Sequence, residues 1–222
     1  MKSVIVALLL LSSISVSAQT RPNAQEIASY TGLHSAAYNN DAGLIAKFIA
    51  NGENPEKPDK VGRTSVHIAA HNSSHEALRA LVLAGANIRA FDNQAYDAIT
   101  IAAVNNDVKL VRLAIELGGD PTAITSPYDG TALIAAAHLG HVEVVKTLIA
   151  AGSPLDHVNN LGWTAMIEAV VLGDGGVSHR NIIKSLLLAG ANPLMADRSG
   201  RTPYQLALQY GFDEMASILK PR

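Results

Sequence analysis

The chain of 222 residues contains no cysteine and only one tryptophan, and charged residues make up just 16% of it. Without cysteine, the protein has no disulfide bond, no thiolate ligand for zinc and no cysteine nucleophile. The formal net charge is -2 at pH 7, so there is no excess of basic residues to bind nucleic acid or an anionic membrane surface. Apolar residues account for 48% of the chain, which predicts a folded protein rather than a disordered one.

Motifs for common enzyme chemistry are also missing. The sequence has no phosphate-binding glycine loop, no dinucleotide-binding fingerprint and no G-x-S-x-G turn of a hydrolase. The glycine-rich stretch from Gly173 to Gly176 lies between two predicted helices rather than after a strand, which disfavours a phosphate site there. We therefore predict no cofactor and no catalytic activity.

Residues 1–18 have the three parts of a secretory signal peptide. Lys2 supplies the positive charge, Val4 to Leu11 is an unbroken apolar run, and small residues up to Ala18 provide a cleavage site. The apolar run is too short to span a bilayer, which favours a cleaved leader over a permanent anchor. We predict cleavage near Ala18 and a periplasmic or secreted protein, with no integral membrane segment after leader removal.

One pattern returns at a nearly constant period along the rest of the chain. Its first position falls at Thr31, Thr64, Asp97, Thr131, Thr164 and Thr202. A period of 33 to 38 residues is typical of a solenoid of stacked units. Each unit has a short alanine-rich stretch and then a stretch with apolar residues at helical spacing. A glycine expected to cap that second helix follows at Gly52, Gly85, Gly118, Gly152 and Gly190.

Turn-forming residues separate each of these glycines from the next unit. Asp59 with Gly62 and Asp197 with Gly200 are examples. They predict a tight, hairpin-like finger that projects from each pair of helices. Residues 19–30 precede the first full unit and are expected to form an N-terminal capping segment, with a short helix from Ala24 to Ser29.

Several units resemble the ankyrin repeat family, whose signature is an aspartate and a glycine, then T-P-L-H-x-A-A, a G-H turn, a V-x-x-L-L helix and a terminal G-A-D/N. The best matches are Asp197 to Pro203, Thr64 to Ala70 and Gly140 to Val145. The resemblance covers about residues 26–220 and implies an all-α solenoid of about six stacked helix-turn-helix units over residues 31–222. The repeats are expected near 26–58, 59–91, 92–125, 126–158, 159–196 and 197–222. Thr100, Ile134 and Ile167 replace the signature histidine, which affects local hydrogen bonding rather than the fold.

The resemblance also implies a binding surface, because ankyrin proteins usually bind partners through the concave face formed by finger tips and first helices. We interpret three aromatic residues at equivalent finger positions as anchors, and two arginines as charges that steer a partner. His138 belongs to the same predicted face, although a structural role also explains it. The alternative is that the rings only cover neighbouring fingers. The predicted partner-binding residues are Arg63, Tyr96, Tyr128, His138, Trp163 and Arg201.

The fifth unit has five extra residues around Gly173 to Val177, between its two helices. This L-G-D-G-G stretch is similar to an insertion in a bacterial ankyrin subgroup. One interpretation is a tolerated loop extension in which Ser178 caps the following helix. The other is a loop that contacts a specific partner.

Taken as a whole, the sequence predicts a non-catalytic protein-protein interaction module of the bacterial periplasm that binds an unidentified exported or envelope protein. A specific version is an immunity-like or accessory protein for an exported enzyme. One alternative is an envelope structural protein. Another is a metal-binding protein or hydrolase that uses His67, His71 and His75, although the repeat register places His71 at the end of the first helix and His75 at the start of the second, rather than on one uninterrupted helix.

Overall fold

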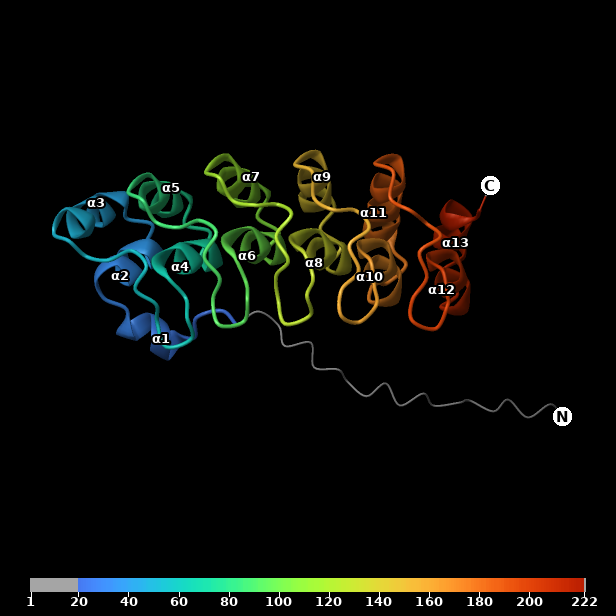
Figure 1. Cartoon of the computed structure of the whole chain (residues 1–222), viewed down its shortest axis with the longest axis horizontal. Helices are drawn as coiled ribbons and strands as arrows, with labels where there is room; N and C mark the ends of the chain where they lie inside the picture. Colours follow the sequence, from blue (N-terminus) through green and yellow to red (C-terminus); the bar gives the residue numbers. More distant parts are fainter. Residues whose placement is uncertain (1–19, 222) are drawn as a thin grey trace.

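The computed structural model describes residues 20–221, which form a row of stacked helix pairs (Figure 1). The predicted signal peptide lies outside the described residues. A short helix, α1 (Ala24–Ser29), precedes the stack and has the expected bounds. The inner row consists of α2 (Gly32–Tyr38), α4 (Ser65–His71), α6 (Ala98–Val104), α8 (Ala132–His138), α10 (Ala165–Val171) and α12 (Pro203–Gln209). The outer row consists of α3 (Ala42–Ala50), α5 (His75–Leu83), α7 (Val108–Glu116), α9 (Val142–Ala150), α11 (Val177–Leu188) and α13 (Asp213–Leu219).

The predicted all-α solenoid is confirmed. Each inner helix packs on its own outer helix and on the inner helices of the neighbouring units, and outer helices likewise contact the next outer helix. We number the six pairs repeats 1 to 6. Figure 1 shows the two rows of helices with the fingers as a third row beside the inner helices. Within residues 20–221 there is no strand, and the only isolated bridge pairs Thr125 with Gly130.

The core contains small apolar side chains from the inner helices and larger ones from the outer helices. Most alanines of the inner helices, such as Ala69 and Ala102, are fully buried, and their small side chains let neighbouring inner helices approach closely. Larger side chains of the outer helices, such as Leu78 and Leu110, are also fully buried and fill the space between the two rows. Apolar burial is therefore shared along the whole stack, as expected for a solenoid.

Polar side chains cap inner helices, and the predicted glycines follow outer helices. Thr164 accepts a hydrogen bond from the backbone N–H of Ile167, and Asp97 accepts one from Thr100 at 2.8 Å, so the aspartate at this position still caps its helix. Gly85 has a φ of +97°, and a Cβ atom there would meet nothing within 4 Å. Backbone conformation rather than crowding therefore requires glycine after α5.

The fingers are tight turns organised by their first side chain. Asp59 accepts hydrogen bonds from the N–H groups of Val61 at 3.0 Å and Arg63 at 2.9 Å, and its own N–H donates to the Arg63 carbonyl. Asn159 and Asp197 make the same bonds in their fingers. The predicted hairpin-like fingers are thus observed. Each finger precedes an inner helix and places its residues beside the concave face.

The extra residues of repeat 5 lengthen α11 to 12 residues, compared with nine in α3, α5, α7 and α9. The expectation that Ser178 caps this helix was wrong, because the N-cap is Gly176 and Ser178 lies in the first turn. Asp174 organises the helix start instead, since its Oδ1 accepts from the Gly176 N–H and lies 2.8 Å from His179 Nδ1. His179 Nε2 in turn lies 3.0 Å from the His138 carbonyl of repeat 4. The inserted stretch therefore ties repeat 5 to its neighbour.

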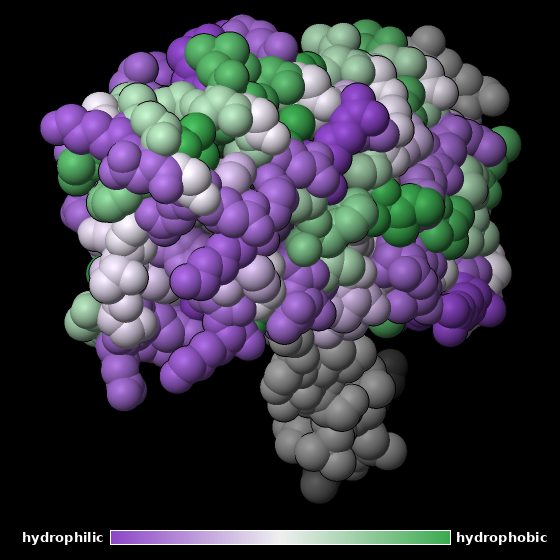
Figure 2. All heavy atoms as spheres, turned by 60° about the vertical axis from the view of Figure 1, so that its left-hand side comes forward, coloured by the Kyte–Doolittle hydropathy of each residue, from purple (hydrophilic) through white to green (hydrophobic). Residues whose placement is uncertain are grey.

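Polar residues cover most of the N-terminal end of the stack, which faces the viewer in Figure 2. The helix α1 has no buried residue and lies beside the fingers rather than in either row of helices (Figure 1). A polar outer surface is what a terminal unit of a solenoid requires, because no further repeat covers it.

Candidate partner-binding face

In repeats 2 to 6, we call the residue directly before the N-cap of the inner helix the pre-cap residue. Hydrogen bonds define the register of the fingers. Ser126 takes the place of the finger aspartate, because its Oγ accepts from the Tyr128 N–H as Asp59 accepts from the Val61 N–H. The pre-cap residues are consequently Arg63, Tyr96, Gly130, Trp163 and Arg201. Four of these five residues are large, and the finger before α8 alone has glycine.

This register corrects the predicted cluster of aromatic anchors. Tyr128 lies two positions before the pre-cap residue and corresponds to Val61 and Leu161, so it is not equivalent to Tyr96 and Trp163. The Tyr96 residue is only 6% exposed, whereas Trp163 is half-buried and packs against the core. The three rings therefore do not form one row. Tyr96 and Tyr128 line a common cavity, and Trp163 is outside its lining.

Arg63 is not available to steer a partner, which corrects a second expectation. Its side chain is 1% exposed, with Nε 2.7 Å from Asp59 Oδ2 and Nη2 2.9 Å from Glu26 Oε1 of α1. Its Nη1 donates to the Thr20 carbonyl at 3.1 Å. The guanidinium therefore fastens residues 20–30 to the stack. The backbone hydrogen bond and side-chain bond from Arg63 outweigh the effect of burial and lower the pKa of Asp59.

The same Asp-Arg pair recurs in the last finger with a different exposure. Arg201 Nη2 lies 2.6 Å from Asp197 Oδ2, and its Nη1 donates to Gln209 Oε1. The arginine side chain is 41% exposed. Arg201 therefore binds Asp197 and Gln209 of its own repeat, and the rest of its side chain stays exposed to solvent.

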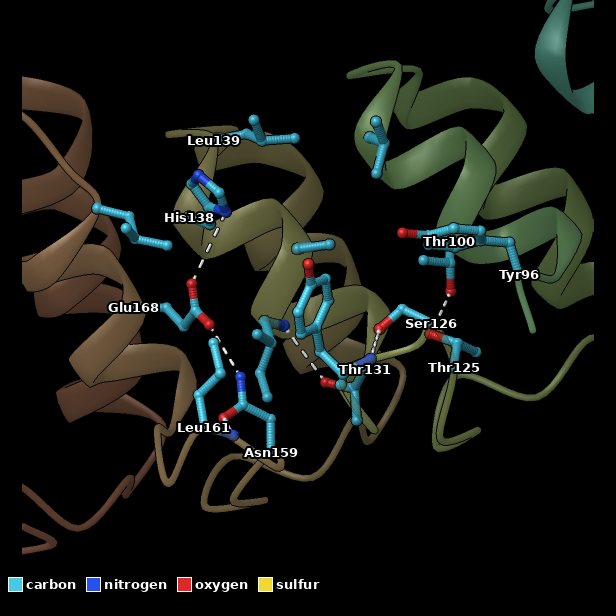
Figure 3. A pocket seen from close by; sticks show the side chains of 16 residues that line it. Tyr96, Thr100, Thr125, Ser126, Thr131, His138, Leu139, Asn159, Leu161 and Glu168 are labelled. Carbon is cyan, nitrogen blue, oxygen red and sulfur yellow. Dashed lines mark hydrogen bonds and ion pairs between the residues drawn. The ribbon is translucent and has the colours of Figure 1, made fainter. Parts of the chain in front are cut away.

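A cavity of about 270 Å³ opens on the concave face among repeats 3, 4 and 5 (Figure 3). Its apolar wall consists of Val104, Ile134, Ala135, Leu139, Leu161 and Leu172. Hydroxyl groups line another part, contributed by Tyr96, Thr100, Thr125, Ser126, Tyr128 and Thr131. The remaining lining residues are Gly130, His138, Asn159 and Glu168. Of the six predicted site residues, three line this cavity, namely Tyr96, Tyr128 and His138. Arg63, Trp163 and Arg201 do not line it.

Gly130 explains why the cavity lies here. A Cβ atom at this residue would be 3.4 Å from Ser126 Oγ and 3.9 Å from Ile134 Cγ2, both of which belong to lining residues. The space that a pre-cap arginine, tyrosine or tryptophan occupies in other fingers is therefore empty in this one. Ile134 also replaces the signature histidine, which in repeat 2 spans to the next finger: His67 Nε2 lies 3.0 Å from the Ala90 carbonyl.

Glu168 is the most unusual side chain of the cavity, and sequence reasoning missed it. It is 4% exposed and lies four residues after Thr164. The equivalent position is aliphatic in the inner helices of repeats 2, 3, 4 and 6, as in Ile101 and Leu206. A carboxyl group at a position that most other repeats fill with aliphatic residues was the signal that could have identified it.

Hydrogen bonding and burial set the charge of Glu168. Its Oε1 accepts from Asn159 Nδ2 at 2.9 Å, and its Oε2 lies 3.7 Å from His138 Nδ1. Figure 3 shows Glu168 on α10 and His138 on α8 pointing toward one another. Burial raises the pKa of Glu168 to about 7, although the Asn159 hydrogen bond opposes the rise. Burial, followed by the charges of His179 and His141, lowers the pKa of His138.

The three histidines of repeat 2 have separate environments. His67 Nδ1 accepts from the Thr64 N–H in a capping box, and His75 Nε2 lies 3.0 Å from Asp107 Oδ2. His71 is buried, and neither ring nitrogen has a hydrogen-bond partner among residues 20–221. Burial, with the charge of Arg63 next, lowers its pKa to about 3. Among the residues that the structure describes, no three His, Asp or Glu side chains are placed to hold a metal ion.

Comparison with known proteins agrees with this architecture. A family model described as ankyrin repeats in three copies matches residues 33–125 and 99–197. The chain belongs to the ankyrin repeat family. Such repeats indicate a protein-protein interaction module, and proteins of the family are generally not enzymes. In the described part of this ankyrin repeat protein, no helix has the length and apolar character needed to cross a membrane.

Two relatives of similar sequence come from bacteria. The ankyrin repeat protein YahD of Escherichia coli is 40% identical over 93 residues, which are 41% of this chain and 46% of that protein. The match thus spans less than half of that relative. An ankyrin repeat domain from Acinetobacter baumannii is 41% identical, with a TM-score of 0.79 over 84% of this chain and 95% of the other.

More distant solved structures share the fold. The ankyrin repeat protein EF0377 has a TM-score of 0.79 and 30% identity, over 86% of this chain and 98% of the other. A chain from the Bdellovibrio bacteriovorus complex of the predatory endopeptidase Bd0816 with the immunity protein Bd3460 has a TM-score of 0.73 over 86% and 97% of the two chains. At 20% identity, this last likeness shows the fold alone.

Proposed function

We propose that the protein is an exported, non-catalytic binding module that holds one partner protein against repeats 3 to 5 of its concave face. The observation that carries the proposal is the cavity at Gly130, because it interrupts an otherwise filled row of pre-cap residues. Partly apolar cavities with a few polar groups are where protein surfaces accept anchoring side chains.

The signal peptide pattern of residues 1–18 supports an exported location, and an exported or envelope protein is therefore the expected partner. An immunity-like or accessory role for an exported enzyme is the specific version that we favour. The fold that this chain shares with a complex between an endopeptidase and its immunity protein is compatible with that role. Mature protein that begins at Gln19, identified by mass spectrometry of a periplasmic or culture fraction, would support export; an uncleaved chain in the cytoplasm would contradict it.

The binding test is a crosslinked capture with the tagged protein from extracts of its own host. Gly130→Trp fills the cavity with a large ring. Leu188→Trp is the matched control, because it adds the same ring at a residue that is 89% exposed on the opposite row of helices. Circular dichroism verifies that both variants are folded.

A single protein captured by the parent and by Leu188→Trp, but not by Gly130→Trp, is the expected result. Equal capture by all three proteins would place the partner elsewhere on the solenoid. If no protein is captured and the chain stays in the washed envelope fraction, the alternative of an envelope structural protein replaces this proposal.

A further inference from the structure

We infer that the cavity among repeats 3, 4 and 5 binds the ammonium end of an aliphatic amine, with Glu168 as its counter-ion. The ammonium group can belong to a lysine side chain or to a small free amine. In the first case the inference rests on the proposed function, and in the second it is independent of it.

A volume of about 270 Å³ lies just below the range of about 300–1,000 Å³ that is typical of pockets for drug-sized ligands and cofactors. The cavity therefore suits a single side chain or a small molecule of similar size. Its lining contains two kinds of apolar group. Aliphatic side chains such as Val104 and Leu161 suit a hydrocarbon stem. The rings of Tyr96 and Tyr128 add favourable surfaces for a cation.

The charge of the occupant follows from Glu168. A buried carboxylate is costly unless a cation or several donors compensate it. The lining residues of the described chain include no lysine and no arginine, and Asn159 supplies a neutral donor to one oxygen only. An ammonium group in the cavity would provide three donors and the missing positive charge. An anion would instead be repelled by the ionised carboxylate.

His138 is the internal group that competes for this role. It lies 3.7 Å from Glu168, beyond hydrogen-bond distance, and burial favours its neutral form. His179 Nε2 lies 3.0 Å from the His138 carbonyl, and His141 Nδ1 lies 2.9 Å from the Ala103 carbonyl. The positive charges that His179 and His141 acquire on protonation further disfavour a charged His138. Glu168 is therefore left without a permanent positive partner at neutral pH.

A divalent metal ion is a poorer occupant than an amine. Metal sites for Ca²⁺ or Mg²⁺ collect several carboxylate or carbonyl oxygens, whereas this cavity offers one carboxylate. No cluster of three metal-ligating side chains exists between residues 20 and 221. One carboxylate at the end of an apolar and aromatic wall is the arrangement that a primary amine on a hydrocarbon stem requires.

The experiment compares three probes of one size: pentylamine, pentanol and pentanoate, titrated into the full chain by NMR and isothermal calorimetry. We expect saturable binding of pentylamine, with at least about tenfold weaker binding of pentanol and none of pentanoate. Glu168→Gln should weaken pentylamine binding by about tenfold and leave pentanol unchanged. Gly130→Trp should abolish binding of both, and Leu188→Trp should leave both unchanged.

The affinity for pentylamine should also rise between about pH 6 and about pH 8, because Glu168 loses its proton in this interval while the amine stays charged. Pentanol should show no such dependence. Equal affinity for the amine and the alcohol, or an unchanged affinity of Glu168→Gln for the amine, would overturn the inference. So would the absence of binding of all three probes to the folded parent protein.

Nα-acetyl-lysine amide distinguishes the two sources of the ammonium group. Binding as tight as that of pentylamine supports a lysine of a partner protein, because the site then admits a stem attached to a peptide backbone. Binding of pentylamine alone supports a small free amine. If the amine binds while the capture experiment yields no partner, the proposed function fails and this inference stands.

Discussion

The chain itself covers the concave face over repeats 2 and 3, whereas the same face is hollow among repeats 3 to 5. In the first region, Thr20 donates to Gln94, and Arg21 bonds to Asn105, so the N-terminal segment crosses two repeats. In the second region, Gly130 leaves the pre-cap space empty. Equivalent repeats thus produce a closed and an open surface, because single pre-cap residues and one flanking segment differ.

The buried charged groups of the two regions differ in how far the chain compensates their charge. Arg63 has Asp59 and Glu26 as partners, so its charge is compensated within the chain. Within residues 20–221, Glu168 has only Asn159 and the more distant His138 as polar partners. A compensated buried charge fastens structure together, whereas an uncompensated one is available to a ligand. The comparison therefore separates a part of the concave face that the chain itself closes from a part for which we propose a ligand.

The largest expected effect comes from removing the compensated charge. Arg63→Ala leaves Asp59 without its ion pair and releases α1, which should lower the free energy of unfolding by about 3–5 kcal/mol. Arg201→Ala is the matched control, because the same Asp-Arg pair is partly exposed there and should contribute about 1 kcal/mol or less. Urea unfolding followed by circular dichroism measures both. If both variants lost the same free energy of unfolding, residues 20–30 would not be held on the concave face by Arg63.

The pH dependence of stability should have opposite signs in the two regions. The pKa of His71 falls from 6.5 to about 3 on folding, so the unfolded chain binds this proton first and stability decreases as the pH falls from 6.5 toward 3. The pKa of Glu168 rises from 4.5 to about 7, so the folded chain keeps this proton longer and stability decreases as the pH rises from 4.5 toward 7.

Two variants separate these contributions. Glu168→Gln should stabilise the protein above pH 7 by about 3 kcal/mol relative to the parent, with little effect near pH 4.5. His71→Leu should instead gain stability relative to the parent as the pH falls below 6.5. Thermal unfolding at several pH values gives both profiles. Parallel profiles for the parent and either variant would show that the replaced group is not perturbed by burial.

The smallest expected effect concerns the glycines. Gly130→Ala should be neutral or stabilising by roughly 0.5 kcal/mol, because its Cβ meets only ordinary contacts and the residue is not among those with positive φ. Gly85→Val should cost about 1 kcal/mol or more, because φ is +97°. Melting temperatures of the two variants decide this point. A loss of stability in Gly130→Ala would contradict the empty pre-cap space.

Much of the architecture could be predicted because it depends on contacts within one repeat or between neighbours. The threonine or aspartate caps, the glycine after five of the six outer helices and the finger aspartates act over a few residues, so their types and spacing are visible in the chain. Tyr128 was assigned to the wrong finger position because Ser126 replaces the usual aspartate and conceals the register.

The sequence by itself determined the repeats, the two rows of helices, the fingers and the family, since all of these arise from local periodicity. Only the tertiary structure decided which arginine is buried, because Glu26 and Thr20 reach Arg63 from another segment of the chain. It also decided that Gly130 on one finger, Glu168 on α10 and His138 on α8 face a common cavity. These residues meet only because three successive repeats stack on one another, so the pattern within a single repeat does not predict their contacts.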